Sequence, residues 1–300
     1  MSSYPVISVL ANEIDQDEQL GSKTKFWIRR GEDRWLFKEA RPNTGEDWAE
    51  KVASEIAKRL NINTAQVELA EFAGKRGCLC QSFLNRDKSW TLIHGNEVLA
   101  KLGVYDGSKK KRQADHTFAN IAKSLAHLKP FPEDAVRDYV LPLLASYVVF
   151  DALISNTDRH HENWGLLWSE AATDALHIEL DVAPTFDHAS SLGRELTEAA
   201  CETNLARKDA IPTYIRRGRG GIYLDASDQH GANPLALVEA SAVQYPAYFM
   251  PTLSRLRDIP LVDLLQPLDL IPDGLIGNAN RIFAKAMLSY SHTALSKLAP

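Results

Sequence analysis

The chain has few of the features that mark secreted or redox-active proteins. Its 300 residues include only three cysteines, Cys78, Cys80 and Cys201. The count is odd, and the first two are one residue too close for a CxxC redox or zinc motif, so we expect three reduced thiols in a cytoplasmic protein. The N-terminus has no basic segment followed by an apolar core, which predicts that there is no signal peptide.

Long hydrophobic runs are also missing. The longest extends from Tyr139 to Phe150 and is interrupted by Pro142 and Ser146. It covers only about half of a bilayer span, so it predicts a buried core helix and no membrane association. The sequence shows no internal repeats and no long low-complexity tract.

Basic residues are in the minority. The 34 Lys and Arg against 39 Asp and Glu give a net charge of −5, which argues against direct binding of nucleic acid. Two local basic runs, at 109–112 and 216–221, have no interleaved aromatic residues that would form a base-stacking platform. Both are typical of solvated loops, with a substrate dock as the alternative for the second run.

The first part of the chain is predicted to be β-rich and the rest mostly helical. Short apolar runs between turns indicate strands, the first three as a meander, and recurring apolar positions indicate helices. We therefore expect an α+β protein of two lobes, 1–87 and 88–300. The strands are predicted at Pro5–Leu10, Lys25–Arg30, Arg34–Lys38, Gln66–Phe72 and Cys78–Phe83, and the helices at Glu46–Leu60, Asp115–Leu128, Asp134–Ile154, Leu235–Phe249, Leu261–Leu265 and Arg281–Leu298.

The most informative motif is a polar segment that follows the longest apolar run. Asp158 is followed five residues later by Asn163, and Asp187 comes after a further hairpin-length segment. A protein kinase arranges its catalytic loop in this way: the first aspartate accepts the hydroxyl proton, and the asparagine and second aspartate hold two magnesium ions against the phosphates. The alternative is a polar surface loop after a helix, where such residues are common.

The chain resembles the HipA-like serine/threonine kinases. The pattern Asn156-x-Asp158-x-His160-x-x-Asn163 matches the catalytic-loop signature of that family, and the segment from Ala183 to Asp187 resembles its metal-binding segment. The resemblance implies a two-lobed protein-kinase-like fold that binds ATP and Mg²⁺ in a cleft, with a nucleotide-binding N-lobe. It also implies Asp158 as the catalytic base and Asn163 and Asp187 as magnesium ligands. His160 is expected to organise the loop.

Lys38 ends a predicted strand and is the best candidate for pairing with the α- and β-phosphates of ATP. Its orienting carboxylate should lie on the following helix. On a helical wheel that starts at Trp48, Glu55 falls about 20° from Trp48, on the margin of the apolar stripe, whereas Glu50 points nearly away from the stripe. Glu55 is therefore the predicted partner, and an exposed helix glutamate is the alternative.

Two further segments are expected to touch the nucleotide. Gly21, Ser22, Lys23, Thr24 and Lys25 resemble the phosphate-covering loop of the family, although a single glycine is a weak signal; Ser22 and Thr24 are candidate autophosphorylation sites. Ser82 and Leu84 flank Phe83 where the linker between the lobes should offer backbone hydrogen bonds to adenine. A solvated turn and a plain strand end are the respective alternatives.

The resemblance implies transfer of the γ-phosphate of ATP to a serine or threonine of a protein. Family members include toxins of toxin–antitoxin systems that phosphorylate aminoacyl-tRNA synthetases and stop translation, which makes such a synthetase and an antitoxin the expected partners. The chain begins almost directly at the phosphate loop, which weakens the expectation of an antitoxin bound through an N-terminal subdomain. A small-molecule kinase and a non-catalytic kinase-like binding module remain alternatives.

Overall fold

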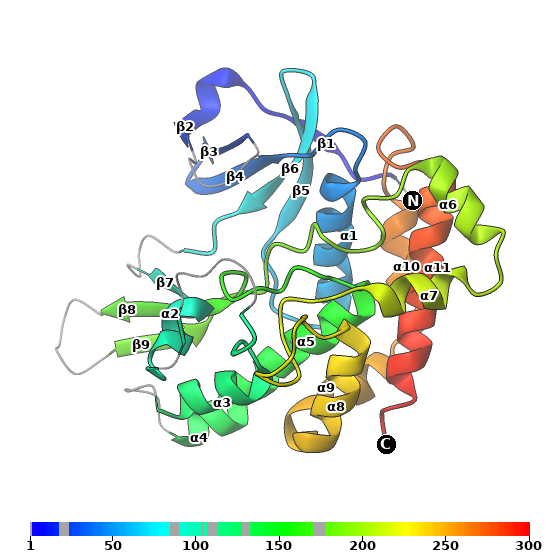
Figure 1. The fold of residues 1–300 in the computed structure, drawn as a ribbon. Helices are drawn as coiled ribbons and strands as arrows, with labels where there is room; N and C mark the ends of the chain where they lie inside the picture. Colours follow the sequence, from blue (N-terminus) through cyan, green and yellow to red (C-terminus); the bar gives the residue numbers. More distant parts are fainter. Residues whose placement is uncertain are drawn as a thin grey trace. The chain divides into compact units, whose positions relative to one another are not determined.

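The computed structural model describes residues 2–17, 24–84, 90–103, 105–106, 113–127, 133–170 and 178–300, and Figure 1 shows its ribbon. The residues group into two compact units that alternate along the chain. Unit 1 therefore draws on segments from both sides of the predicted boundary at residue 87, whereas unit 2 lies almost entirely after it. Unit 1 comprises Met1–Ser82, Asp187–Ile215 and Ile259–Tyr290, and unit 2 comprises Phe83–Phe186, Arg216–Asp258 and Ser291–Pro300.

Unit 1 is built on a six-stranded sheet. The strand order is β1-β5-β6-β4-β3-β2, with β1 parallel to β5 and every other pair antiparallel. The strands are β1 (Val6–Ser8), β2 (Ile14–Asp17), β3 (Lys25–Arg30), β4 (Asp33–Glu39), β5 (Val67–Phe72) and β6 (Lys75–Gln81), and a 3₁₀ turn, η1 (Ala11–Glu13), precedes β2.

Aromatic side chains make up much of the core of this sheet. The rings of Phe26 and Phe37 stack with centroids 4.9 Å apart, and Phe72 packs edge-on against Phe26 at 4.8 Å. Phe37 is fully buried in the middle of β4. The same strand carries Lys38 on its other face, because successive side chains of a strand alternate.

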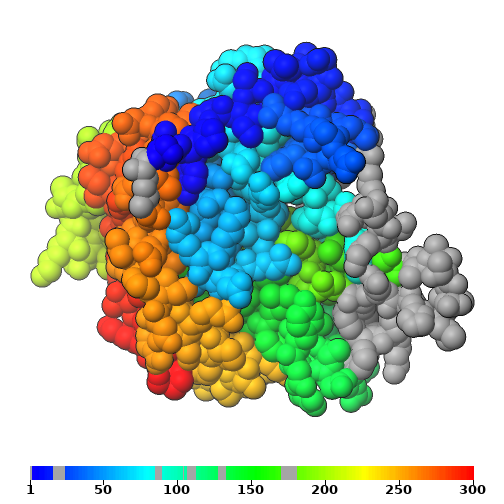
Figure 2. Space-filling model, turned by 180° about the vertical axis from the view of Figure 1, so that it is seen from behind, coloured from blue at the N-terminus to red at the C-terminus, as the bar shows by residue number. Residues whose placement is uncertain are grey.

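Helix α1 (Glu46–Arg59) lies between the sheet and the helical part of unit 1. Nearly all of its first three turns are buried, including the polar residues Glu46, Asp47, Glu50 and Lys51. It packs on β5, β6 and α10 (Leu261–Asp269), and Arg59 donates to Gln266 across the contact with α10. This face is drawn in Figure 2, where the light-blue residues of α1 border the orange residues of α10. Unit 1 also holds α6 (Glu198–Leu205), α7 (Ala210–Arg217) as far as Ile215, and most of α11 (Asn278–Ser296).

Unit 2 combines a small sheet with a helical bundle. Its three strands, in the order β7-β8-β9, are antiparallel. The central helix α5 packs on α8 and α9. The elements are β7 (Thr91–His94), β8 (Gly165–Glu170), β9 (Ile178–Val182), α2 (Gly95–Ala100), α3 (Phe118–Ala126), α4 (Glu133–Ala135), a π-helical turn η3 (Val136–Val140), α5 (Leu141–Ile154), α8 (Pro234–Gln244) and α9 (Pro246–Asp258).

The longest apolar run of the sequence forms most of α5. Twelve of its residues are buried, so the helix has no polar face and lies within the core of unit 2, as predicted. A left-handed residue, Ser155, ends the helix with φ of 54°, and the chain then turns into the Asn156–Asn163 loop. Among the described helices, none is both long enough and apolar enough to span a bilayer.

The predicted mixture of strands and helices is confirmed, but several elements differ from the prediction. The first strand does not join a meander: β1 pairs with β5 at the opposite edge of the sheet from β2. The helix predicted at Leu235–Phe249 divides into α8 and α9 at Pro246, where the proline lacks the N–H that would continue the helix. The strands β7 to β9 were missed: β7 and β8 lack a clear alternating pattern, and β9 alternates apolar and polar residues but is only five residues long.

Removal of the Phe37 ring tests the core of unit 1. Phe37→Ala is expected to lower the free energy of unfolding by about 3–5 kcal/mol, because the buried ring would leave a cavity between Phe26 and Phe72. Leu10→Ala, at a side chain that is 57% exposed, should change it by less than about 0.5 kcal/mol. Urea titration followed by circular dichroism would measure both, and equal losses would contradict the assignment.

Candidate active site

Lys38 and Asp187 form an ion pair within unit 1. The Nζ of Lys38 donates to Oδ1 of Asp187 at 2.8 Å. Burial lowers the pKa of Lys38, but the Asp187 carboxylate outweighs this effect and the net pKa is raised well above its usual value. In turn the Lys38 ammonium lowers the pKa of Asp187, and Lys25 adds to this effect against the opposing influence of burial. Both groups are therefore charged throughout the neutral range.

The backbone at Asp187 is unusual. Its φ is +61°, in the left-handed region that non-glycine residues seldom occupy. Such a conformation persists where the surrounding structure fixes it, and here the ion pair holds the side chain while the next residue, His188, donates its N–H to Glu50. The residue predicted as a metal ligand thus has a fixed direction relative to β4 and α1.

Glu50 lies on α1 beside this pair. Its Oε1 accepts the His188 N–H at 2.9 Å and is 3.6 Å from Nδ1 of the same histidine, whereas its Oε2, although buried, has no hydrogen-bond partner in the described part of the chain. Burial raises the pKa of Glu50, but Lys38 and the hydrogen bond with His188 together lower it by more, so the net shift of the pKa is downward. A buried carboxylate with one unused oxygen is thus held close to Lys38.

The predicted pairing of Lys38 with Glu55 is not the arrangement found. The Glu55 carboxylate accepts from Lys51 at 3.0 Å and from Lys58 at 2.8 Å. Glu50, which the helical wheel turned away, is the α1 glutamate that acts on Lys38. The wheel assumed one buried face, but the first three turns of α1 are buried nearly all round, so the apolar stripe does not tell which side faces the site.

The loop that follows α5 holds Asp158 and Asn163 through backbone hydrogen bonds in unit 2. Asn156 accepts the Asp158 N–H at 3.1 Å, and the carbonyl of Asp158 accepts from Nδ2 of Asn163 at 2.7 Å and from the His160 N–H at 2.7 Å. With its amide nitrogen committed in this way, Asn163 retains its carboxamide oxygen for a cation. The two predicted catalytic-loop residues are thereby fixed relative to each other.

Arg159 is the centre of this loop, and the sequence reasoning missed it. Its guanidinium pairs with both carboxylate oxygens of Asp151, at 2.7 and 2.8 Å, and also donates to the Thr185 hydroxyl at 2.8 Å. Further bonds reach the carbonyls of Asn163 and Phe186. Asp151 is therefore the structural partner of this guanidinium. The only sequence signal for this pair is an aspartate on a buried helix that is followed eight residues later by an arginine in a polar loop. That spacing is too common to predict an ion pair.

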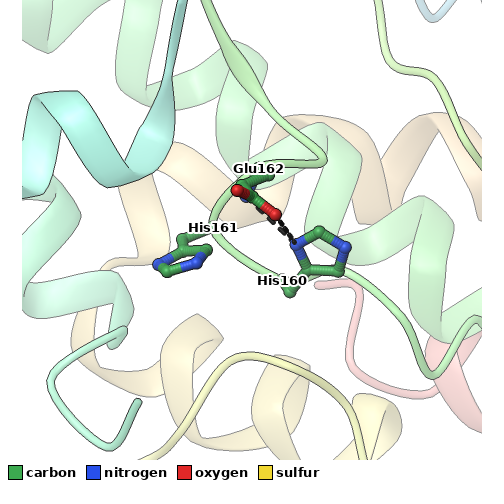
Figure 3. Close-up of side chains that lie close together, drawn as sticks. All are labelled: His160, His161 and Glu162. Carbon is green, nitrogen blue, oxygen red and sulfur yellow. Dashed lines mark hydrogen bonds and ion pairs between the residues drawn. The ribbon is translucent and has the colours of Figure 1, made fainter. Parts of the chain in front are cut away.

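His160, His161 and Glu162 are the one group of described residues whose side chains approach closely enough to share a metal ion, with ligand atoms within 4.8 Å of one another (Figure 3). Nδ1 of His160 already accepts the Glu162 N–H at 3.2 Å, and Nδ1 of His161 is hydrogen-bonded to the hydroxyl of Tyr105. We therefore assign these side chains to the hydrogen bonding of the loop. The predicted role of His160 as an organiser of the loop agrees with its position but stays a prediction.

His116 supports the loop through hydrogen bonds to Trp164 and Gly221, and the sequence reasoning did not identify it. Trp164 donates its indole N–H to Nε2 of His116 at 3.0 Å, and Nδ1 of His116 bonds to the Gly221 carbonyl at 2.8 Å. Gly221 lies directly on the loop, since a Cβ there would be 2.7 Å from the Arg159 carbonyl oxygen. Gly221 of the second basic run therefore packs against the Asn156–Asn163 loop, which gives this run a structural role that composition did not reveal.

Of the other residues predicted to touch the nucleotide, some lie in the described part of the chain and some do not. Gly21, Ser22 and Lys23 lie outside the described residues. Thr24 is bonded to Glu39, Lys25 begins β3, and Ser82 continues β6 with its N–H on the Arg34 carbonyl at 2.8 Å. Leu84 is exposed. The first basic run, at 109–112, also lies outside the described part of the chain.

Comparison with solved structures identifies the fold as kinase-like. The proinflammatory kinase CtkA of Helicobacter pylori matches with a TM-score of 0.80 at 18% identity, over 98% of both chains. HipA of Shewanella oneidensis, solved with HipB and operator DNA, matches with a TM-score of 0.57 at 12% identity. That alignment covers 95% of this chain and 65% of HipA.

The family model of the HipA-like C-terminal domain matches residues 17–237, which is more than half of the chain. The chain therefore belongs to the HipA-like C-terminal domain family, as its catalytic-loop motif predicted. A comparison with curated proteins gave no match.

His116 makes the stability of unit 2 depend on pH. Burial lowers the pKa of His116 to about 3, so the unfolded chain takes up a proton below pH 6.5 that the folded chain does not. This contribution to stability is complete above pH 6.5 and is lost, at up to about 1.4 kcal/mol per pH unit, as the pH falls toward 3.

His116→Gln keeps a donor and an acceptor but does not titrate. The difference in unfolding free energy between the native protein and this variant should be constant above pH 6.5 and should fall below it. Urea titrations of both proteins from pH 4 to 8 would measure the difference. A difference that stays constant across this range would refute a buried neutral His116.

Proposed function

We propose that the protein is an ATP-dependent serine/threonine protein kinase that moves the γ-phosphate of ATP to a protein hydroxyl. The observation that carries the proposal is the Lys38–Asp187 ion pair, a cation for phosphate and an ionised carboxylate for a metal ion held together within unit 1. Membership of the HipA-like family supports the same chemistry.

The residues fit magnesium. Asn163 donates its amide N–H to the Asp158 carbonyl, so its carboxamide oxygen is available as a ligand. Asp187 is kept ionised by Lys38. Both are hard oxygen ligands, as Mg²⁺ prefers beside phosphate. When bound, the ion would neutralise charge on the phosphates. In this proposal Lys38 neutralises the α- and β-phosphates, and Thr24 and Lys25 belong to the loop that covers them.

Asp158 is assigned the role of accepting the proton of the acceptor hydroxyl. The loop fixes its backbone through Asn156 and Asn163, so the carboxylate would be positioned before substrate arrives. His160, bonded through its N–H to the Asp158 carbonyl, would keep that conformation. Ser82 and Leu84 are assigned to the adenine side of the nucleotide.

The acceptor is proposed to be a protein of the translation machinery, an aminoacyl-tRNA synthetase, as the family resemblance implies. An antitoxin protein is proposed as a second partner, because the HipA structure with a similar fold was solved together with HipB. Both partners would make this kinase a toxin that stops translation.

Asp158→Asn is expected to reduce phosphoryl transfer at least about 1000-fold, because it removes the proton acceptor. The asparagine side chain has nearly the same size and shape, so the fold should be retained. The purified chain would be incubated with γ-labelled ATP and magnesium, alone and with a host lysate. Glu162→Gln, at an exposed carboxylate in the same loop, is the matched control and should retain transfer. Labelling of small molecules only would indicate a small-molecule kinase, and ATP binding without transfer would indicate a binding module.

A pair of substitutions on α1 tests which glutamate serves Lys38. Glu50→Gln removes the negative charge beside Lys38 and should weaken ATP binding and lower turnover by about tenfold or more. Glu55→Gln, on the same helix, changes contacts with Lys51, Lys58 and Arg59 and should alter ATP binding and turnover by less than about twofold. Equilibrium binding of ATP and initial rates would decide, and the reverse order would restore the prediction from the helical wheel.

A further inference from the structure

Three exposed arginines of unit 2, Arg216, Arg217 and Arg219, form a positively charged run that the proposed reaction does not use. Other arginines of this unit are paired with an aspartate beside them, as Arg137 and Arg257 are. No carboxylate in the described part of the chain forms an ion pair with any member of the arginine run. Its positive charge is therefore available to a partner of opposite charge.

The carboxylates that follow the run in the sequence are occupied within their own turn. Asp228 accepts the Asp225 N–H at 3.0 Å, and Asp225 accepts the N–H and the hydroxyl of Ser227 at 2.8 and 2.6 Å. Asp225 and Asp228 close this turn through local hydrogen bonds and do not serve as partners of the arginine run.

The guanidinium of Arg219 is held by backbone carbonyls along one edge only. Its Nη1 donates to the carbonyls of Arg216 and Gly218 at 3.0 Å each, and Nδ2 of Asn233 donates to the same Gly218 carbonyl at 3.1 Å. The Nε–Nη2 edge has no acceptor among the described residues. Two parallel N–H groups on that edge match the two oxygens of a carboxylate.

The same unit contains this arrangement with its carboxylate in place. Nη1 of Arg159 donates to the backbone carbonyls of Asn163 and Phe186, while its Nε and Nη2 donate to the two oxygens of Asp151 at 2.7 and 2.8 Å. Arg219 repeats the backbone half of this pattern at the surface. The carboxylate half is the part that a partner would supply.

The arginine run lies close to the residue proposed to accept the proton. Gly221 packs on the Asn156–Asn163 loop, since a Cβ there would be 2.8 Å from Cα of His160. Arg219 is two residues before Gly221, and Asp158 is two residues before His160. Because consecutive Cα atoms are about 3.8 Å apart, those of Arg219 and Asp158 are at most about 20 Å apart. An extended peptide covers that distance in about six residues.

An acidic protein segment suits the arginine run better than nucleic acid does. A DNA-binding surface typically contacts about 6–10 phosphates, and surfaces for single strands add aromatic side chains that stack on the bases. The run has three arginines and no aromatic residue between them, and the whole chain has a net charge of −5. A few fixed guanidinium groups instead match the carboxylates of a short peptide.

We propose that the arginine run binds carboxylate side chains of the protein that accepts the phosphate, within about six residues of the modified serine or threonine. Arg219 binds one carboxylate through its Nε–Nη2 edge, and Arg216 and Arg217 add charge. The inference deepens the proposed protein kinase function and rests on it. The three arginines are positioning residues, so they act on the KM for the acceptor and not on kcat.

Two synthetic peptides with the full chain and γ-labelled ATP test this preference. Each has a central serine flanked on both sides by about six residues, in which alanine alternates with glutamate in one peptide and with glutamine in the other. The KM of the glutamate peptide should be at least about fivefold lower at similar kcat, and added salt should reduce the difference. Transfer to both peptides with equal KM would overturn this inference and leave the proposed kinase function intact.

Substitutions locate the preference. In the double variant Arg217→Gln, Arg219→Gln, the KM of the glutamate peptide should rise to within about twofold of that of the glutamine peptide, with the KM for ATP unchanged. Arg217→Gln alone leaves the backbone contacts of Arg219 in place and should remove part of the preference. Arg137→Gln, at an exposed arginine paired with Asp138, is the matched control and should keep the preference in full. A preference that survives in the double variant would refute the assignment.

Binding measured without ATP separates this inference from the proposed function. Fluorescence anisotropy of the labelled glutamate peptide should show tighter binding than that of the glutamine peptide, and the double variant should lose the difference. That result without any phosphoryl transfer would support the acidic dock and contradict the kinase proposal alone. Tighter binding of a single-stranded oligonucleotide than of the glutamate peptide, through the same arginines, would identify a nucleic-acid surface and overturn the inference.

Discussion

The ion pair between Lys38 and Asp187 joins residues that are 149 positions apart in the chain. A buried or half-buried charge is stable in a protein only with a partner, and each of these residues is the principal stabilising charge for the other. The pair therefore ties the segment after residue 186 to the central strand β4. The left-handed conformation of Asp187 and the hydrogen bond from His188 to Glu50 follow from that connection.

The neighbouring residues Phe186 and Asp187 belong to different units and have different partners. Phe186 belongs to unit 2, where its carbonyl accepts from Arg159 and its ring lies 5.5 Å from that of Phe83. Asp187 belongs to unit 1. Phe83 and Phe186 are thus the residues at which the chain first enters and first leaves unit 2, and they contact each other. Both passages of the chain are anchored at one place in that unit, beside the network that holds the Asn156–Asn163 loop.

Sequence reasoning selected candidate residues from their spacing and position, and their catalytic roles stay predictions. Asp158, Asn163 and Asp187 stand out because their spacing is rare, and Lys38 because a strand ends beside it. Residues that act by support were not identified. Arg159 lies within the motif itself, but nothing local shows that its guanidinium reaches Asp151 and Thr185. His116 is about 40 residues before the loop, and its two hydrogen bonds, to Trp164 and Gly221, exist only after folding.

Helix α1 shows why the remaining part could not be predicted. Periodicity identifies a buried face when the opposite face is in water, but α1 is enclosed by the sheet and α10, so its polar residues are buried too. Each buried charge on it then has a specific partner: Asp47 with Arg76, Lys51 with Glu68, and Glu50 with His188. Because burial of an unpaired charge is costly, these partners fix the rotation of the helix. The rotation that brings Glu50 to Lys38 also turns Lys51 toward Glu68 and Asp47 toward Arg76, so one packing arrangement determines all three pairings.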